Sequence, residues 1–206
     1  MIQLLAASTN PGKVREIRES LAGLPFVLRT LADHPDLPVY AEDGRTFEEI
    51  ARSKCLFYSR TMGSLVMAED SGLEIAALGG APGVYSARFS GPEATDEKNI
   101  DKVLGLLAGT PRAERRARFV CCIALALDSK VIAEIRGTVE GMITTERRGR
   151  SGFGYDPIFF YPPLARTFGE LAPEEKNSVS HRGRALRELK TFLAGYLAGG
   201  TPAHGE

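Results

Sequence analysis

Two adjacent carboxylates, Glu69 and Asp70, follow an apolar run that is predicted to be a strand ending at Ala68. Open α/β sheets bind ligands at the carboxyl ends of strands, so acids placed there are candidates for a ligand site. Such a pair can hold a hard divalent cation and activate a water molecule. It can equally be a solvated acidic turn. Further acids that could assist lie upstream, at Glu42, Asp43, Glu48 and Glu49.

A polar segment follows the first predicted strand, and it reads Ser8-Thr9-Asn10-Pro11-Gly12-Lys13. Proline fits the first turn of a helix and asparagine fits its cap. A helix N-terminus presents free N–H groups and a positive dipole end, which suits phosphate. The segment is not a Walker A loop, because the first glycine and the hydroxyl residue after the lysine are missing. The alternative is a capped helix with one exposed lysine.

A third segment combines glycines with aromatic residues, and it reads Ser151-Gly152-Phe153-Gly154-Tyr155-Asp156-Pro157. Glycines allow the backbone to approach a ligand closely. Either Phe153 or Tyr155 could stack on a nucleobase, since every base offers a π-face. Asp156 could accept a hydrogen bond from a ring N–H. The alternative is a turn whose aromatic residues belong to the core.

Cations mark a fourth segment, which consists of Lys176 and the run Ser180-His181-Arg182-Gly183. Lys176 and Arg182 could neutralise the charge of a phosphate. His181 falls in the first turn of a predicted helix and could offer its ring or its backbone N–H. The alternative is a capped helix with a basic first turn. Cations there oppose the helix dipole, and this local conflict favours a functional role.

Hydrophobic periodicity predicts the elements that must position these segments. Strands are expected over residues 2–7, 26–30, 64–68, 117–127, 130–140 and 157–161, with the two longest joined in a hairpin at Asp128-Ser129. Helices are expected to follow the caps Asn10, Thr46, Thr95 and Ser180, and Thr46 with Glu49 matches a capping box. Residues 32–45 are predicted to form an irregular loop. The predicted class is α/β with a mixed sheet.

Composition limits the classes of function. The 206 residues suit one large domain or two tightly joined lobes. The 26 basic and 26 acidic residues cancel, whereas a general nucleic-acid binder carries a basic excess. The longest apolar run, residues 119–127, is too short to span a bilayer, and the first residues lack a signal-peptide layout. Three cysteines, two of them adjacent, make a poor disulfide framework, so a reducing cytoplasm is expected.

Five stretches together closely resemble the inosine/xanthosine triphosphate pyrophosphatase family, whose members remove non-canonical purine nucleotides. They are ASTNPGK at residues 7–13, EDSGL at 69–73, LGGAPGVYSARF at 78–89, GFGYDPIF at 152–159 and SHRG at 180–183. They occur in the family's order and extend over nearly the whole chain. Each stretch is modest alone, but five in order are hard to produce by chance.

The resemblance implies a two-lobed α/β fold in which helices flank a long mixed β-sheet and the nucleotide cleft lies between the lobes. It implies hydrolysis of ITP, dITP and XTP to the monophosphate and pyrophosphate with Mg²⁺, by a protein that is usually a homodimer. We expect one such domain over residues 1–198. The tail at 199–206 is expected to be disordered.

The resemblance also assigns roles to individual residues. It makes residues Ser8 to Lys13 the triphosphate-binding segment and residues Phe153 to Asp156 the base-binding loop. It makes Asp70 the proton acceptor and a metal ligand, with Glu42 as a further metal ligand. The implied substrate contacts are Ser71, Lys176, His181 and Arg182. Lys54 also fits the family's pattern.

One departure and two rival functions accompany this interpretation. The family's second helix usually begins with Glu-Asn-Ala, whereas this chain has Glu49-Ile50-Ala51, and isoleucine cannot make an amide's hydrogen bonds. The nearest rival is a pyrophosphatase for pyrimidine or modified nucleoside triphosphates on a related fold. The second rival is a nucleotide-binding protein without turnover. Its mark would be loss of the carboxylates or of Lys13, and these residues are present.

Overall fold

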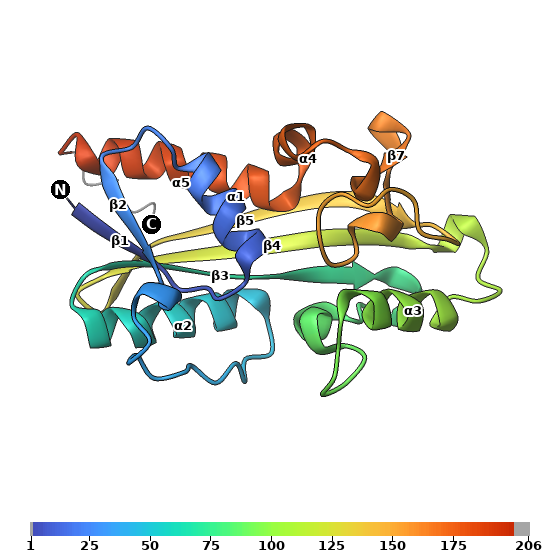
Figure 1. Cartoon of the computed structure of the whole chain (residues 1–206), viewed down its shortest axis with the longest axis horizontal. Coiled ribbons are helices and arrows are strands. Elements are labelled where there is room, and N and C mark those ends of the chain that lie inside the picture. Colours follow the sequence, from blue (N-terminus) through green and yellow to red (C-terminus); the bar gives the residue numbers. More distant parts are fainter. Residues whose placement is uncertain (1, 200–206) are drawn as a thin grey trace, which may run out of the picture.

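A seven-stranded sheet organises the protein, and a computed structural model describes residues 2–199 of the chain (Figure 1). In chain order the strands are β1 (Ile2–Ala6), β2 (Phe26–Thr30), β3 (Leu65–Ile75), β4 (Arg116–Leu127), β5 (Lys130–Ile143), β6 (Phe159–Tyr161) and β7 (Arg166–Thr167). The helices are α1 (Pro11–Ser20), α2 (Phe47–Met62), α3 (Asp96–Leu106), α4 (Pro173–Val179) and α5 (His181–Leu197). Apart from Gly199, the expected disordered tail lies outside the described residues.

The sheet is mixed, as the sequence predicted, and its strand order is β2-β1-β3-β4-β5-β6-β7. The strand β1 runs parallel to both β2 and β3, whereas every later pairing is antiparallel. The pairing of β3 with β1 ends at Met67, but its pairing with β4 continues to Ile75. From Ala68 onward, one edge of β3 is therefore free of β1.

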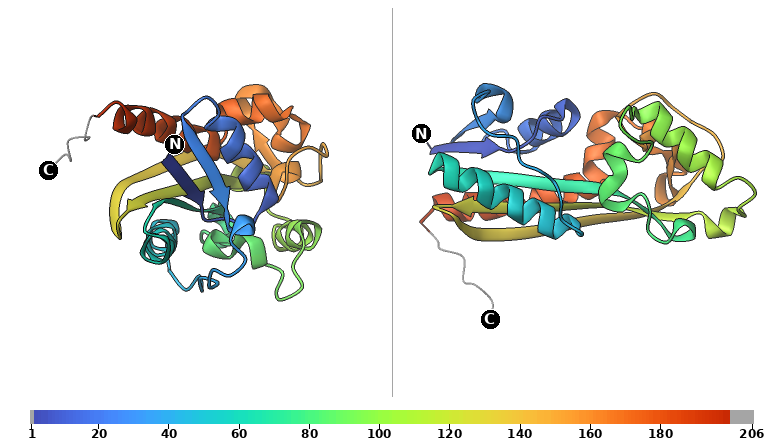
Figure 2. Two further views of the ribbon diagram at one scale, coloured as in Figure 1. Left: turned by 60° about the vertical axis from the view of Figure 1, so that its left-hand side comes forward. Right: turned by 90° about the horizontal axis from the view of Figure 1, so that it is seen from below.

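Helices cover both faces of this sheet, with α1, α4 and α5 on one face and α2 and α3 on the other (Figures 1 and 2). Successive side chains of a strand point to opposite faces. Met67 accordingly packs in the core cluster under α1 and α5, and its neighbours Val66 and Ala68 pack in the cluster over α2. The same alternation sends Glu69 toward α1 and α5 and sends Asp70 toward α2.

Local capping fixes where the helices begin. The side chains of the four predicted caps each accept a backbone N–H three residues on, in the order Asn10, Thr46, Thr95 and Ser180. The capping box at the start of α2 is only half formed. Thr46 accepts from the N–H of Glu49, but the Glu49 carboxylate accepts from the N–H of Arg45 at 2.9 Å instead of from Thr46.

Three strand predictions need correction, and in the simplest case the strand expected over 130–140 continues to Ile143. The strand expected over residues 64–68 runs on to Ile75, because β4 pairs with it along its whole length, so Glu69 and Asp70 lie inside the strand rather than at its end. The strand expected over 157–161 begins only at Phe159, because Pro157 belongs to a short 3₁₀ turn. The short helix α4 was not predicted.

The hairpin between β4 and β5 forms as predicted. Its two turn residues, Asp128 and Ser129, have φ angles of 48° and 64°. Two left-handed residues are the requirement of the tight hairpin turn that matches the twist of the strands. None of the helices within residues 2–199 combines the length and hydrophobicity that crossing a bilayer requires.

The contact between β5 and α5 gives a test of this packing. A Cβ on Gly137 would overlap the carbonyl oxygen of His181 and would lie 2.9 Å from the backbone nitrogen of Ala185. We expect Gly137→Ala to lower the free energy of unfolding by ~1–3 kcal/mol through overpacking, measured by urea denaturation. Gly195 lies in α5 with open space around its Cβ position. Gly195→Ala should therefore raise the free energy of unfolding by ~0.5–1 kcal/mol. Equal effects of the two substitutions would contradict this packing.

Candidate active site

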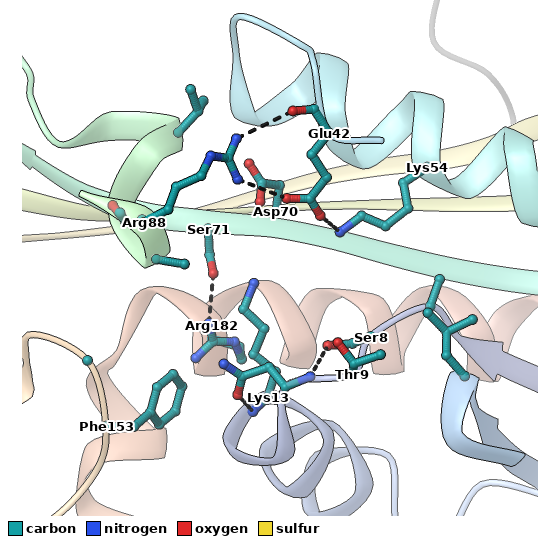
Figure 3. A pocket seen from close by; sticks show the side chains of 18 of the residues that line it. Ser8, Thr9, Lys13, Glu42, Lys54, Asp70, Ser71, Arg88, Phe153 and Arg182 are labelled. Atoms are coloured by element: carbon teal, nitrogen blue, oxygen red, sulfur yellow. Dashed lines mark hydrogen bonds and ion pairs between the residues drawn. The ribbon is translucent and has the colours of Figure 1, made fainter. Parts of the chain in front are cut away.

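A cavity of about 640 Å³ lies at the free edge of β3. It is lined by residues from the β1–α1 connection, the loop after β2, α2, β3 and the starts of α3 and α5. Because β1 does not pair with β3 beyond Met67, the cavity reaches both faces of the sheet (Figure 3). Every residue to which the family resemblance gives a role lines it except Pro11 and Gly12, whereas Glu69 does not line it.

Asp70 is a buried carboxylate whose negative charge is only partly compensated by nearby cations. Its side chain faces the α2 side of the cavity, and its Oδ2 atom is buried without a hydrogen-bond partner among residues 2–199. Burial raises the pKa of Asp70 to about 6, because the Glu42 and Glu69 charges reinforce burial and the Lys13 and Lys54 ammonium groups only partly oppose it. At neutral pH the carboxylate is therefore mostly ionised yet close to its pKa, which suits a general base.

Glu69 has the opposite environment on the other face of β3. Its carboxylate lies 3.1 Å from Lys13 Nζ and accepts from Arg182 Nε at 3.0 and 3.1 Å. Burial alone would raise the pKa of Glu69, but the charges of Arg182 and Lys13 outweigh it and hold the pKa at about 2. Glu69 is a permanent anion that orients Lys13 and Arg182, whereas Asp70 is free to react.

The ion pairs continue inward from Arg182. Its Nη1 donates to Glu16 at 2.7 Å, and the other Glu16 oxygen lies 3.1 Å from Lys176, which also bonds Asp156 at 2.6 Å. All four of these side chains are buried. Buried carboxylates thus match the charges of Lys176 and Arg182 in the free protein, and the expectation that these two cations neutralise phosphate stays a prediction. These ion pairs hold the shape of this wall.

Glu16 was not predicted as a site residue, although it links two predicted ones, Lys176 and Arg182. The available signal was its spacing, because residues three apart on a helix are neighbours and Lys13 precedes it by one such step. What the sequence could not supply was its partners, which come from α4 and α5 at the other end of the chain.

The aromatic-glycine segment contributes one ring to the cavity. Phe153 is half-buried, and its ring lies 4.6 Å from Lys176 Nζ and 5.3 Å from Arg182 Cζ. Tyr155 is buried in the core and donates its hydroxyl to the Ser86 carbonyl at 2.8 Å. Of the two candidates for base stacking, the structure leaves Phe153. The Oδ2 atom of Asp156 accepts the Phe153 N–H at 2.9 Å and so holds the loop, while its role toward a base N–H stays a prediction.

His181 lines the same end of the cavity in its neutral form. Its ring stacks on Phe119 with centroids 4.6 Å apart and an interplanar angle of 10°. Burial lowers the pKa of His181 well below its ordinary value, and the charges of Arg182, Lys176 and Lys13 lower it further. Its Nδ1 atom is buried without a partner in the described part of the chain. An unpaired ring nitrogen is available to a ligand's polar edge.

The geometry has a counterpart among known proteins. The family model described as "Ham1 family" matches residues 4–192. The chain belongs to the Ham1 family.

Curated relatives and solved structures of this family match the chain along most of its length. A dITP/XTP pyrophosphatase from Exiguobacterium sp. is 47% identical over 96% of this chain and 100% of its own. A dITP/XTP pyrophosphatase from Geobacter sulfurreducens is 48% identical over 94% of this chain and 97% of its own. The structure of a HAM1 protein from Coxiella burnetii superposes with a TM-score of 0.87 at 42% identity, covering 94% of this chain and 99% of that one.

Glu42 is the second carboxylate on the Asp70 side of this Ham1-family cavity. It is bonded to Lys54, and its Oε2 atom lies 3.6 Å from Arg88 Nη1. Burial alone would raise the pKa of Glu42, but the Lys54 hydrogen bond and charge hold it below its ordinary value. Two of the other upstream acids have partners elsewhere: Glu48 pairs with Arg136 at 3.1 Å, and Glu49 accepts the Arg45 N–H at the start of α2.

Asp70 and Glu42 are the candidate metal ligands of this cavity. Residues 2–199 contain no group of three or more acidic, histidine or cysteine side chains that could hold a metal ion. Asp70 and Glu42 nevertheless line one cavity, and the Glu42 charge contributes to the raised pKa of Asp70. Magnesium is usually bound by one or two carboxylates together with substrate phosphates and water. Two acids, one of them with an unpaired buried oxygen, therefore fit a magnesium ion whose coordination shell is completed by a phosphate ligand.

Ile50, which replaces the asparagine usual in the family, fills space next to this loop. It is fully buried, and a Cβ on Gly44 would lie 2.6 Å from its Cγ1 atom. The side chain therefore supports the segment that follows Glu42. It does not line the cavity.

The ion pairs of Glu69 generate a prediction. We expect Glu69→Gln to lower the free energy of unfolding by ~3 kcal/mol at pH 7, because removing one member of a buried pair leaves the other charges uncompensated. Since folding lowers the pKa of Glu69 from 4.5 to about 2, its contribution is fully present above pH 4.5 and is lost as the pH falls toward 2.

Denaturant unfolding at pH 7 and at pH 3 measures this dependence. Glu134→Gln is the matched control, because Glu134 makes an exposed ion pair with Arg52 at 2.7 Å. The control should lose ~0–1 kcal/mol. A loss for Glu69→Gln no larger than that of the control would refute the structural role of Glu69.

Proposed function

We propose that this protein is a nucleoside triphosphate pyrophosphatase that hydrolyses the non-canonical purine nucleotides dITP, ITP and XTP to the monophosphate and pyrophosphate. The observation that carries the proposal is the unpaired, buried oxygen of Asp70 in a cavity that also contains lysine and arginine side chains. The printed name of the relatives, dITP/XTP pyrophosphatase, supports the same activity.

Cleavage of a phosphoanhydride needs an activated water molecule and compensation for the charge that the leaving group gains. Asp70 accepts the proton of a water molecule that attacks the α-phosphorus, and a pKa of about 6 leaves it mostly ionised at pH 7 to 8. Lys13 and Lys54 offset the negative charge on the departing pyrophosphate. The reaction needs no covalent intermediate on the protein.

We propose Mg²⁺ as the cofactor, with Asp70 and Glu42 as its protein ligands. Support comes from the donor set, which is two carboxylates in one cavity that lysine and arginine side chains also line. When bound, magnesium would neutralise phosphate charge and polarise the bond that breaks. Asp70 would then serve both as a ligand and as the proton acceptor.

Selectivity is proposed to come from the edge of the base. Hypoxanthine and xanthine carry a 6-oxo acceptor where adenine carries a 6-amino donor. Phe153 offers a stacking face, and the unpaired Nδ1 atom of His181 lies at the same end of the cavity, where as an N–H it would donate to the 6-oxo group. The Arg182 guanidinium beside it is held by Glu69, Glu16 and Ser71. With ATP the His181 donor would face another donor, and such a mismatch can give discrimination of about 10⁴. Exclusion of GTP must depend on the 2-position.

We also propose that the protein acts as a homodimer in the cytoplasm. The homodimer follows from the family resemblance. Cysteine usage supports the compartment, since Cys55, Cys121 and Cys122 are free thiols. Neither nucleic acid nor a membrane is proposed as a partner, because the formal charge of the chain is zero and the cavity suits a small anion.

Replacement of Asp70 separates activity from stability. We expect Asp70→Asn to abolish release of pyrophosphate from ITP while raising the free energy of unfolding of the metal-free protein. The raised pKa means that the charged form destabilises the fold, a cost that is small at pH 4 and fully present above pH 6. The gain at pH 8 should be ~1–3 kcal/mol and should shrink at pH 4.

Urea denaturation in EDTA at the two pH values, with a pyrophosphate assay, provides the test. Glu74→Gln serves as the control, because Glu74 lies on the same strand but pairs with Arg118 away from the cavity. Near-normal turnover by Asp70→Asn would disprove its role as the proton acceptor.

A substrate panel tests the function itself. With magnesium, we expect pyrophosphate release from ITP, dITP and XTP to exceed that from ATP by orders of magnitude in kcat/KM, and no release without magnesium. A preference for dTTP or UTP would favour the pyrimidine-specific rival. Tight binding of ITP without product would favour a nucleotide-binding protein.

A further inference from the structure

Arg88 lines the cavity on the side of Asp70 and Glu42, yet no step described above uses it. It is the last residue of a 3₁₀ segment, Gly83–Arg88, that lies beside β3. Its Nη1 atom lies 3.6 Å from the Glu42 carboxylate, and its Nη2 donates to the Glu42 carbonyl at 3.4 Å. Figure 3 shows both contacts, with Asp70 and Ser71 beside them. The guanidinium also lies over the Tyr85 ring, 5.4 Å from its centroid.

The cations of the cavity differ in what holds them. Lys176 and Arg182 are buried among Glu16, Asp156 and Glu69, and Lys13 pairs with Glu69. Lys54 and Arg88 form their ion pairs with Glu42, and in the described part of the chain neither has another carboxylate partner. Whether Lys54 and Arg88 are available to bind another anion therefore depends on the Glu42 carboxylate.

Glu42 faces two competing demands. In the free protein it neutralises Lys54 and Arg88, whereas the proposed function requires it as a ligand of a divalent cation beside Asp70. A carboxylate that turns to a divalent cation gives up much of its attraction for other cations. Recruitment of Glu42 would thus leave two positive side chains facing the space where phosphates must lie.

We propose that Arg88 is a triphosphate-binding residue that Glu42 holds in reserve until the divalent cation binds. The inference rests on the proposed function and adds a substrate-binding group to it. Arg88 pairs with Glu42 in the free protein and passes to the phosphates when Glu42 ligates the metal. Metal and triphosphate then favour each other's binding through this one arginine, because coupling between two ligands is reciprocal.

The side-chain environment suits such an exchange. Arg88 and Glu42 are 43% and 31% exposed, and ion pairs of this exposure contribute little, so separating them costs little. A guanidinium binds phosphate through two parallel hydrogen bonds, which are stronger than its present long contacts. The Tyr85 ring supports the guanidinium plane by a cation–π contact and keeps it near the cavity during the exchange.

The test compares binding of inorganic tripolyphosphate with and without magnesium, by isothermal titration calorimetry on the intact protein. Arg88→Met should weaken binding about tenfold or more in magnesium, because a charge-assisted hydrogen-bonding group is lost. In EDTA the same substitution should change the affinity for tripolyphosphate by less than about twofold, because Arg88 is already paired with Glu42. Mn²⁺ binding without phosphate, followed by electron paramagnetic resonance, should be a few-fold tighter in Arg88→Met.

Two further variants make the result specific. Arg118→Met is the matched control, since Arg118 is similarly exposed and pairs with Glu74 but does not line the cavity; it should behave as wild type. Glu42→Gln should release Arg88, so that Arg88→Met in this background weakens tripolyphosphate binding even in EDTA. Thermal unfolding of each variant verifies that it is folded.

The outcomes distinguish this inference from the proposed function. A wild-type protein that releases no pyrophosphate from ITP would refute the function. A wild-type protein that does so, together with an Arg88→Met variant that binds tripolyphosphate normally in magnesium, would refute only the role of Arg88. An equal loss with and without magnesium would make Arg88 an ordinary phosphate contact and would overturn the reserve held by Glu42.

Discussion

The site depends on the alternation of side chains along one strand. Glu69 and Asp70 are neighbours in β3, so one must point to each face of the sheet. On one face Glu69 meets Lys13 and Arg182, and on the other Asp70 meets a wall that contains Glu42 and Lys54. Early termination of β1 exposes the strand edge between these two environments. The cavity therefore has contact with both faces of the sheet. The pKa values of the two carboxyl groups are shifted in opposite directions, lowered for Glu69 and raised for Asp70.

The two faces solve opposite electrostatic problems. Around Glu69 and Glu16 every buried charge has an opposite partner, and the resulting chain of ion pairs reaches from β3 through α5 and α1 to α4. Around Asp70 one carboxylate oxygen is left buried and unpaired. The first arrangement fixes a shape, and the second retains free energy that a ligand can recover by satisfying the oxygen. Proteins commonly tolerate such unsatisfied groups where they act on ligands.

Local signals in the sequence predicted the helix starts, the β4–β5 hairpin and the segments that meet at the cavity. Helix caps and turn residues act within three or four positions, so their effects can be deduced without knowledge of the fold. The length of β3 could not be deduced, because its second half is set by pairing with β4, some fifty residues away. The sequence likewise marked Lys176 and Arg182 as available cations. Their neutralisation by Glu16 follows from the packing of α1 against the C-terminal helices, which no local pattern encodes.

The absence of a side chain at Gly12 has a geometric consequence. A Cβ there would lie 2.7 Å from the Phe153 ring, so the first turn of α1 and the aromatic loop are in direct contact. Lys13, the next residue, pairs with Glu69 on β3. Two consecutive residues of α1 thus connect the aromatic loop to the central strand. A side chain larger than glycine at position 12 would push the Phe153 loop away from α1, and it would move one wall of the cavity relative to the strand that carries Asp70.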